Sequence, residues 1–481
     1  MAGRIAATRG ERARTLLSRI MPPMLANLSG AQDPDAAFAA FAAFVEGLPA
    51  SLQIFSLLDH NRELTRLLGD ILVLSPRLSD SLRRHPMLFD LVLFAAFFAP
   101  LPGCDELESE LRAAIADQPT ELALETVTRV TRERQFRAEV QHLSGVADRR
   151  ALGTALADTA VAAIRVTRDL AIADMRRRHG VIDGDLAVIA MGRLGLGDLT
   201  ATSDLDLVFV WDAPADALST GIDGGGRSLG ASTYFPRLAQ TLASWLGGAT
   251  GEGKLYDIDL RLRPDGEKSG LAPSLARLTA YYRDDAWLWE KLALGKARLV
   301  TPAAACGAAV IASLAFVRTT ALPIDSMVRP LHDMRRRLRD SYSNAGRWQL
   351  RKQPGGISEL DLLVQALRFA NADLFDNAAA IADTILDRLA GSGRITPGDA
   401  EALGAADSLY ADLHHALRLV VGGGATDPKA LSPSARRFIC DACDSPDIET
   451  LQGRITACQA QVEALFDRLF PPPIDRESRR V

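Results

Sequence analysis

The stretch that decides the fold is GRLGLGDLTATSDLDLVF, residues 192–209. Its second half alternates charged and apolar side chains, and this alternation is the period of a β-strand. Asp204 and Asp206 therefore share one face, while Leu205 and Leu207 point into a core. The first half is rich in glycine and is typical of a turn. The pattern predicts a strand that presents two carboxylates on one side, directly after a glycine-rich turn.

A second charged stretch, YDIDLRLRP at residues 256–264, shows the same alternation. Its charged face is predicted to carry Asp257, Asp259, Arg261 and Arg263. If the two strands lie side by side, three or four carboxylates meet, and like charges at close range repel one another unless cations neutralise them. Oxygen ligands suit Mg²⁺ or Mn²⁺, and the arginines suit a polyphosphate. We favour a two-metal nucleotide site over the alternative, a pair of edge strands with solvated charges.

The whole-chain values are those of a globular protein with two or three domains. The chain has 481 residues, a formal net charge of −5 and 48% apolar residues, so its bulk charge does not favour a nucleic-acid partner. The longest apolar run, residues 91–99, is too short to cross a bilayer and is expected to be a buried helix end. No secretory signal is visible. We therefore expect a cytoplasmic protein with no membrane partner.

The five cysteines do not form a disulfide framework in a chain of this length. Cys440 and Cys443 make a single CxxC pair, and a zinc site needs two further ligands. The nearby candidates, Cys458 and the pair His414–His415, are weak. We therefore do not expect zinc.

Helical periodicity dominates both ends of the chain, and a strand-rich segment separates them. Asp33–Pro34 is typical of a helix start, with an N-cap followed by proline at the first helical position. The predicted fold class is α+β with mostly α-helix overall. The predicted units are a helical N-terminal region at 1–180, an α+β core at 181–302, a helical bundle at 303–470 and a flexible tail at 471–481.

Several further blocks follow the two charged strands in a fixed order. They are Tyr281-Tyr282, Trp289-Glu290, Lys296-Ala297-Arg298, Gly355-Gly356-Ile357 and Glu359-Leu360-Asp361. Together with the glycine turn and the three aspartates, they resemble the glutamine synthetase adenylyltransferases, which belong to the polymerase-β-like nucleotidyltransferase superfamily. The resemblance implies a nucleotidyltransferase core with a small mixed sheet, flanked by all-α domains.

The resemblance also implies a reaction and a set of site residues. Asp204, Asp206 and Asp259 are expected to hold two Mg²⁺ (or Mn²⁺) ions, with ATP as the substrate. AMP passes to a tyrosine of glutamine synthetase, and pyrophosphate leaves. The residues expected to bind the nucleotide are Gly192, Arg193, Gly195, Ser203, Arg261 and Arg263. The two glycines are expected to let backbone N–H groups approach phosphate, and one of the last two arginines is a candidate to brace the metal-binding aspartates.

The family enzyme has two homologous halves, one that attaches AMP and one that removes it. This chain carries one nucleotidyltransferase core and resembles the C-terminal, adenylylating half. The alternatives are the phosphorolytic AMP-removing half and a catalytically weak regulatory module. The implied partners are glutamine synthetase and the PII signal protein, with glutamine as a possible effector.

This sequence departs from the family pattern at several positions. Arg193 and Arg351 stand where the family has lysine, and the glycine turn ends in Gly195-Leu196-Gly197-Asp198 where the family has Gly-Gly-Arg-Glu. Glu359 and Asp361 exchange the order of the two family carboxylates. Each of them is expected to be either a bridge from the helical domain to the site or a structural ion pair. Asp257 is a possible supporting partner of the site.

Overall fold

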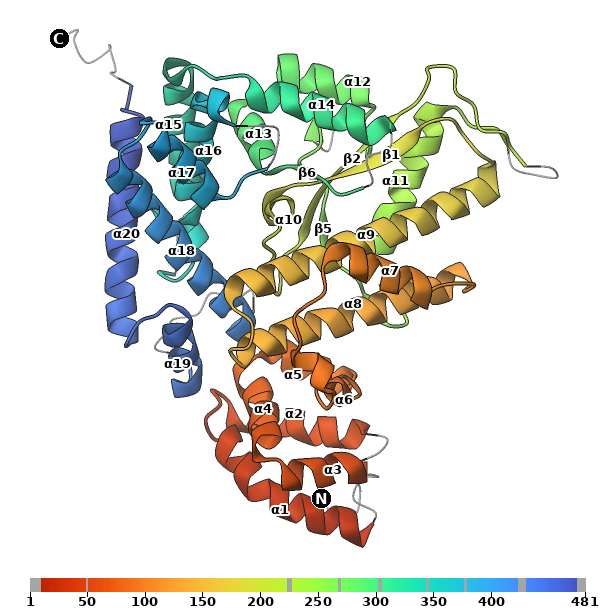
Figure 1. Cartoon of the computed structure of the whole chain (residues 1–481), viewed down its shortest axis with the longest axis vertical. Coiled ribbons are helices and arrows are strands. Elements are labelled where there is room, and N and C mark those ends of the chain that lie inside the picture. The colour runs from red at the N-terminus through yellow and green to blue at the C-terminus, as the bar shows by residue number, and fades with distance from the viewer. Residues whose placement is uncertain are drawn as a thin grey trace.

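The computed structural model describes residues 10–48, 51–222, 227–266, 270–301, 305–342, 346–375, 379–422 and 430–473. Most of the expected tail, from residue 474 onward, lies outside these ranges. The architecture is α+β: helices at both ends of the chain enclose a small mixed sheet (Figure 1). The predicted fold class is thus confirmed.

The first six helices of the chain form an N-terminal bundle, which lies at one end of the long axis (Figure 1). They are α1 (Glu11–Leu28), α2 (Pro34–Gly47), α3 (Ser51–His60), α4 (Arg62–Leu74), α5 (Pro76–Arg84) and α6 (Leu88–Leu91). The expected cap of α2 is present, because the Asp33 side chain accepts a hydrogen bond from the Ala36 amide. Phe41 and Phe44 lie in a core of this bundle's own. Ser75 Oγ donates to the Leu419 carbonyl (2.8 Å) and ties the bundle to the C-terminal helices.

Three further helices connect this bundle to the sheet. They are α7 (Cys104–Ala114), α8 (Thr120–Leu143) and α9 (Arg149–His179). The Asp148 side chain caps α9, and alanines along the helix allow close packing. Near its C-terminal end, Arg168 Nε donates to the Leu186 carbonyl (2.7 Å) and the guanidinium pairs with Asp185. The helix is thereby fixed to the first strand of the sheet.

The sheet has four strands in the order β5-β2-β1-β6. Their bounds are β1 Asp185–Ala190, β2 Leu205–Asp212, β5 Ile258–Asp259 and β6 Arg298–Leu299. β1 pairs antiparallel with both β2 and β6, whereas β2 pairs parallel with β5. Between β2 and β5 lie α11 (Ala231–Gly247) and a hairpin of β3 (Ala249–Thr250) and β4 (Gly253–Lys254). The strand predicted over Asp204 and Asp206 is β2, which begins one residue after Asp204.

Both faces of the sheet are buried, and each face belongs to a different hydrophobic core. Leu205 and Leu207 lie with α9 and α11 in one core. Val208 and Val210 lie on the opposite face, in a core built with the C-terminal helices. The predicted boundaries near residues 180 and 302 follow changes of secondary structure, while buried side chains pack across both positions.

The C-terminal part is helical, as predicted. Its helices are α14 (Ala305–Thr319), α15 (Ile324–Asp340), α16 (Ile357–Ala370), α17 (Ala382–Gly391), α18 (Pro397–Val420), α19 (Pro433–Ala442) and α20 (Ile448–Leu469). Three short helices precede this part and lie closer to the sheet: α10 (Gly192–Leu196), α12 (Leu275–Ala280) and α13 (Leu288–Ala293). In the described residues, no single helix is long and apolar enough to cross a membrane. α14 and α15 reach the criteria of length and composition only as a pair that is bent by 98°.

Two local predictions were wrong. The second charged strand is two residues long, because the Asp259 carboxylate accepts a hydrogen bond from the Arg261 amide (2.9 Å) and turns the chain out of the sheet. Residues 91–99 are not a buried helix end: α6 stops at Leu91, and 63% of Phe94 is exposed. Side chains of α8 bind the backbone carbonyl groups of this segment; for example, Arg137 Nε donates a hydrogen bond to Phe97 O (2.8 Å).

Candidate active site

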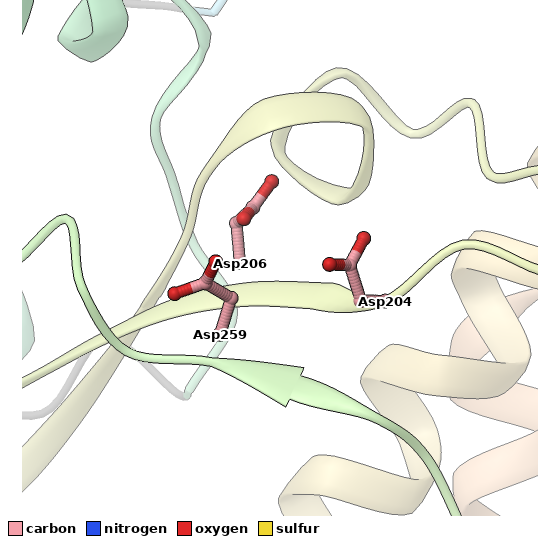
Figure 2. Close-up of side chains that lie close together, drawn as sticks. All are labelled: Asp204, Asp206 and Asp259. Atoms are coloured by element: carbon pink, nitrogen blue, oxygen red, sulfur yellow. The ribbon is translucent and has the colours of Figure 1, made fainter.

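Three aspartates meet at the edge of the sheet (Figure 2). Asp206 on β2 and Asp259 on β5 are register partners in the parallel pair, so their side chains rise from the same face. Asp204 lies two residues before Asp206 and shares that face. One carboxylate oxygen from each residue lies within 4.8 Å of the other two. The expected cluster of three carboxylates is therefore present.

The charges in this cluster shift the pKa values in opposite directions. Burial, together with the negative charges of Asp204 and Asp259, raises the pKa of Asp206 to about 6. Hydrogen bonds from Arg261 hold the pKa of Asp259 below its usual range. A divalent cation would neutralise the repulsion that raises the pKa of Asp206, and a convergent set of carboxylate oxygens is the donor set that Mg²⁺ or Mn²⁺ prefers. The residues present therefore fit the expected metal ions.

Gly192 and Gly195 lie in the short helix α10, where the sequence predicted a turn, and they allow this helix to pack closely. Gly192 has φ +55°, and a Cβ atom built there would lie 2.3 Å from Asp206 Oδ2. A Cβ atom on Gly195 would lie 1.9 Å from the backbone oxygen of Lys296. The amide N–H of Gly195 donates to the Met191 carbonyl (3.0 Å). It is thus engaged within α10, which differs from our expectation that this amide approaches phosphate.

The turn is closed by hydrogen bonds on both sides. The Ser203 amide donates to the Thr200 carbonyl (3.1 Å), and Ser203 Oγ accepts a hydrogen bond from the Thr200 amide (3.1 Å). Arg193 Nη1 donates to Asp198 Oδ2 (2.9 Å). Burial raises the pKa of Asp198, but His415 and the two arginines Arg193 and Arg149 outweigh burial and lower it to about 2. Arg193 and Ser203 line the cavity beside the three aspartates.

The two arginines after Asp259 behave differently from each other. Arg261 Nε donates to both oxygens of the Asp259 carboxylate (3.0 and 2.9 Å) and lines the cavity. This is the bracing role that the sequence left open for one of the pair. Arg263 Nη1 donates instead to the Leu260 carbonyl (2.7 Å), and Arg263 is not among the cavity residues. The structure therefore brings one of the two arginines to the site.

The aspartates open into a cavity of about 570 Å³ between the sheet and the C-terminal helices. Its charged residues are Arg149, Arg150, Arg193, Asp198, Asp204, Asp206, Asp259, Arg261, Lys296, Arg351, Asp361, Asp383, Asp407 and Arg418. Sequence reasoning missed the contribution of α18, which adds Asp407, His414 and Arg418. These residues recur at helical spacing, but nothing in one sequence shows that this face meets residues two hundred positions earlier.

Glu359 and Asp361 of α16 have different roles: one of them bridges to the site, and the other forms a structural ion pair. Asp361 pairs with Lys296 at the cavity and is the bridge from the helical region to the site. Glu359 is fully buried and accepts hydrogen bonds from Arg335 Nε (2.8 Å) and Arg339 Nε (2.7 Å) of α15. Glu359 is therefore the structural ion pair.

Other candidates lie away from the cluster. Asp257 is exposed and pairs with Lys254, although its backbone oxygen accepts a hydrogen bond from the Leu205 amide (2.8 Å). Cys440 and Cys443 are buried, and burial raises the pKa of the Cys443 thiol to about 12. In the part of the chain that the structure describes, the side chains grouped closely enough to bind a metal ion are the three aspartates, and no cysteine belongs to this group.

The α+β fold and the carboxylate cluster at its sheet edge are the features that the sequence led us to expect of a nucleotidyltransferase. Within this class, the chain belongs to the glutamate-ammonia ligase adenylyltransferase family, whose model matches residues 65–312. A second family model, GlnD PII-uridylyltransferase, matches residues 327–470. The resemblance stated from the sequence is thus confirmed.

Curated relatives carry the name bifunctional glutamine synthetase adenylyltransferase/adenylyl-removing enzyme. The chain is 36% identical over 470 residues to the protein of Xanthobacter autotrophicus, covering 96% of this chain and 47% of the relative. It is 32% identical to that of Bradyrhizobium sp. (strain ORS 278), with 98% and 48% covered, and 31% identical to that of Brucella suis biovar 1, with 97% and 47% covered. The chain spans about half the length of the curated relatives it matches.

Proposed function

We propose that this chain transfers AMP from ATP to a tyrosine hydroxyl of glutamine synthetase and releases pyrophosphate. The observation that carries the proposal is the register of β2 and β5, which sets Asp206 opposite Asp259 with Asp204 beside them. Membership of the family adds the class of reaction, and the name of the relatives adds the acceptor. A cytoplasmic enzyme of nitrogen metabolism follows from the same proposal.

The aspartates supply the oxygen ligands, and Arg261 keeps the Asp259 carboxylate oriented. When bound, two divalent ions neutralise charge on the triphosphate and favour ionisation of a phenol whose ordinary pKa is about 10. The tyrosine oxygen bonds to the α-phosphorus of ATP as the bond to the bridging oxygen breaks. Pyrophosphate leaves, and the phenolic proton passes to water. The glycine turn lets Asp206 lie against the backbone of α10 without a steric clash.

The direct test is transfer of label from [α-³²P]ATP to purified glutamine synthetase, with Mg²⁺ or Mn²⁺ and with a chelator. Metal-dependent labelling by the parent and none by Asp206→Asn is expected. Labelling that persists in the chelator, or that the variant retains, would refute the metal-dependent transfer.

The second candidate function is phosphorolytic removal of AMP, because the name of the relatives includes an adenylyl-removing activity. It is tested with adenylylated glutamine synthetase, orthophosphate and metal. We expect slow ADP release relative to labelling. Rapid ADP release without ATP would assign this chain to the removing reaction.

We further propose PII protein as a partner, supported by the second family model over the C-terminal helices. Glutamine remains a proposed effector. Both are tested by adding PII protein in either modification state, or glutamine, to the labelling assay. A rate that neither addition changes would argue against regulation through this chain.

A further inference from the structure

One face of the C-terminal half of α18 lines the active-site cavity. Asp407, Ala411, His414 and Arg418 recur at intervals of four, three and four residues, and all four line the cavity. This spacing is that of one helix face. The face is acidic at its N-terminal end and basic at its C-terminal end, and the two ends are about 16 Å apart along the axis.

Five of the seven cationic side chains at the cavity are already paired with carboxylates. The pairs are Arg149 with Asp412 and Asp198, Arg150 with Asp383, Arg193 with Asp198, Arg261 with Asp259 and Lys296 with Asp361. Arg351 and Arg418 are the other two. Among the described residues, no carboxylate lies within ion-pair distance of either, so their charges are left for a ligand.

Arg418 and Arg351 lie beside the metal-binding aspartates. Arg418 Nη1 donates to Thr202 Oγ1 (3.0 Å), two residues before Asp204. Burial and the neighbouring positive charge of Arg351 lower the pKa of Arg418, and the negative charge of Asp204 opposes this only in part. Arg351 also acts on Asp206, where its charge opposes the rise of the carboxyl pKa. Two guanidinium groups that repel each other next to a cation site form a favourable place for a polyanion.

We propose that Arg351 and Arg418 bind the β- and γ-phosphates of the nucleotide and hold the pyrophosphate as it leaves. The inference rests on the proposed function and adds the residues that recognise the triphosphate. It replaces the expected pair Arg261 and Arg263, since one of these braces Asp259 and the other lies outside the cavity. Asp407 at the far end of the same helix face repels phosphate, so the nucleoside lies toward that end.

The test is equilibrium binding to the full chain in Mg²⁺ with three probes: α,β-methylene-ATP, inorganic tripolyphosphate and AMP. Arg351→Ala and Arg418→Ala should each weaken binding of the two triphosphate probes about tenfold or more. Binding of AMP should stay within about twofold in both variants, because AMP lacks the phosphates that are gripped. Lysine at either position should restore part of the affinity, since it keeps the charge but loses the planar fork.

Lys352→Ala is the matched control, because Lys352 is exposed, adjacent to Arg351 and outside the cavity. It should bind all three probes as the parent does. Thermal unfolding of each variant checks that the fold is retained.

Equal loss of AMP and triphosphate binding would mean that the two arginines only support the fold of the cavity, and parental triphosphate binding by both variants would also overturn the proposal. A chain that binds tripolyphosphate through these arginines but binds neither nucleotide would retain the anion site and refute the proposed adenylyl transfer. Thus the two proposals fail by different results.

Discussion

Asp206 and Asp259 are register partners in the parallel pair of β2 and β5, so the metal site depends on strand pairing as much as on residue identity. A slip of β5 by one residue would turn Asp259 to the opposite face and bring Ile258 or Leu260 to the cluster. Asp259 itself ends the strand by accepting the Arg261 amide, which limits the pairing to this register. The same carboxylate thus serves as ligand and as strand terminator.

Asp204→Asn and Asp206→Asn should each abolish AMP transfer and leave the fold intact. Asp206→Asn should also raise the stability of the metal-free protein by roughly 1 kcal/mol, because it removes a charge that burial and two neighbouring carboxylates disfavour; this value is discounted for solvent screening. Label transfer and thermal unfolding in chelator measure the two effects. Near-parental transfer at saturating Mg²⁺ would contradict the metal assignment.

Metal affinity should fall as the pH drops through about 6, the raised pKa of Asp206. A proton on this carboxylate competes with the metal, so affinity should decline about tenfold per pH unit below that value. In the metal-free protein, the free energy of unfolding changes with pH in the opposite direction to the metal affinity. The favourable effect of a protonated Asp206 is complete below its ordinary pKa of 3.8 and is lost as the pH rises toward 6. Mn²⁺ titration between pH 5 and 8, paired with unfolding in chelator, checks both; a flat profile would show that Asp206 is not a ligand.

Gly195→Ala should destabilise the protein by about 2–3 kcal/mol, because the new methyl group meets the backbone oxygen of Lys296, which cannot move away as a side chain can. Gly453→Ala is the control: this glycine is exposed inside α20 with no heavy atom near its Cβ position. The control should gain about 0.5–1 kcal/mol from helix propensity. Urea unfolding of both variants gives the comparison, and equal stabilities would show that the turn has room to relax.

Glu359→Ala should cost about 3–5 kcal/mol of stability, because it removes the fully buried carboxylate that Arg335 and Arg339 share and leaves Arg335 with only the more exposed Glu463 and Asp467. Asp361→Asn should change stability by less than about 1 kcal/mol, since its pair with Lys296 is partly exposed. It should slow transfer, because Lys296 is no longer held at the cavity. Unfolding and label transfer on the two variants separate these roles; a stable Glu359→Ala protein would remove the structural assignment.

The sequence was informative where chemistry is carried by local spacing. The alternation at Asp204 and Asp206 placed both carboxylates on one face, and the resemblance supplied Asp259 as their partner. Local spacing failed at Arg263, which does not reach the cavity, because period-two reasoning ignores the hydrogen bond by which Asp259 bends the backbone and ends the strand. It also could not reveal Arg418, whose place beside Thr202 is set by tertiary packing.

The exposed turn after α6 illustrates a different limit. Residues 91–99 are apolar, and composition alone predicted burial for them. The structure holds this segment by polar contacts of Arg137 and Gln141 to its carbonyl oxygens, with Phe94 outside. Such side chain-to-backbone contacts leave no periodic signal in the sequence.

Because the sheet is buried on both faces, it limits which segments of the gene can be duplicated or fused and still encode a folded protein. The strand that carries Asp206 buries Leu205 against α9 and α11 and Val208 against the C-terminal helices. A gene segment that encoded the strands alone would expose both apolar faces and would not yield a folded product. A gene segment that gene duplication or fusion moves in folded form must therefore encode the strands together with α9, α11 and the C-terminal helices. Evolution can vary the N-terminal bundle more freely than either flank of the sheet, because most of that bundle's core is its own.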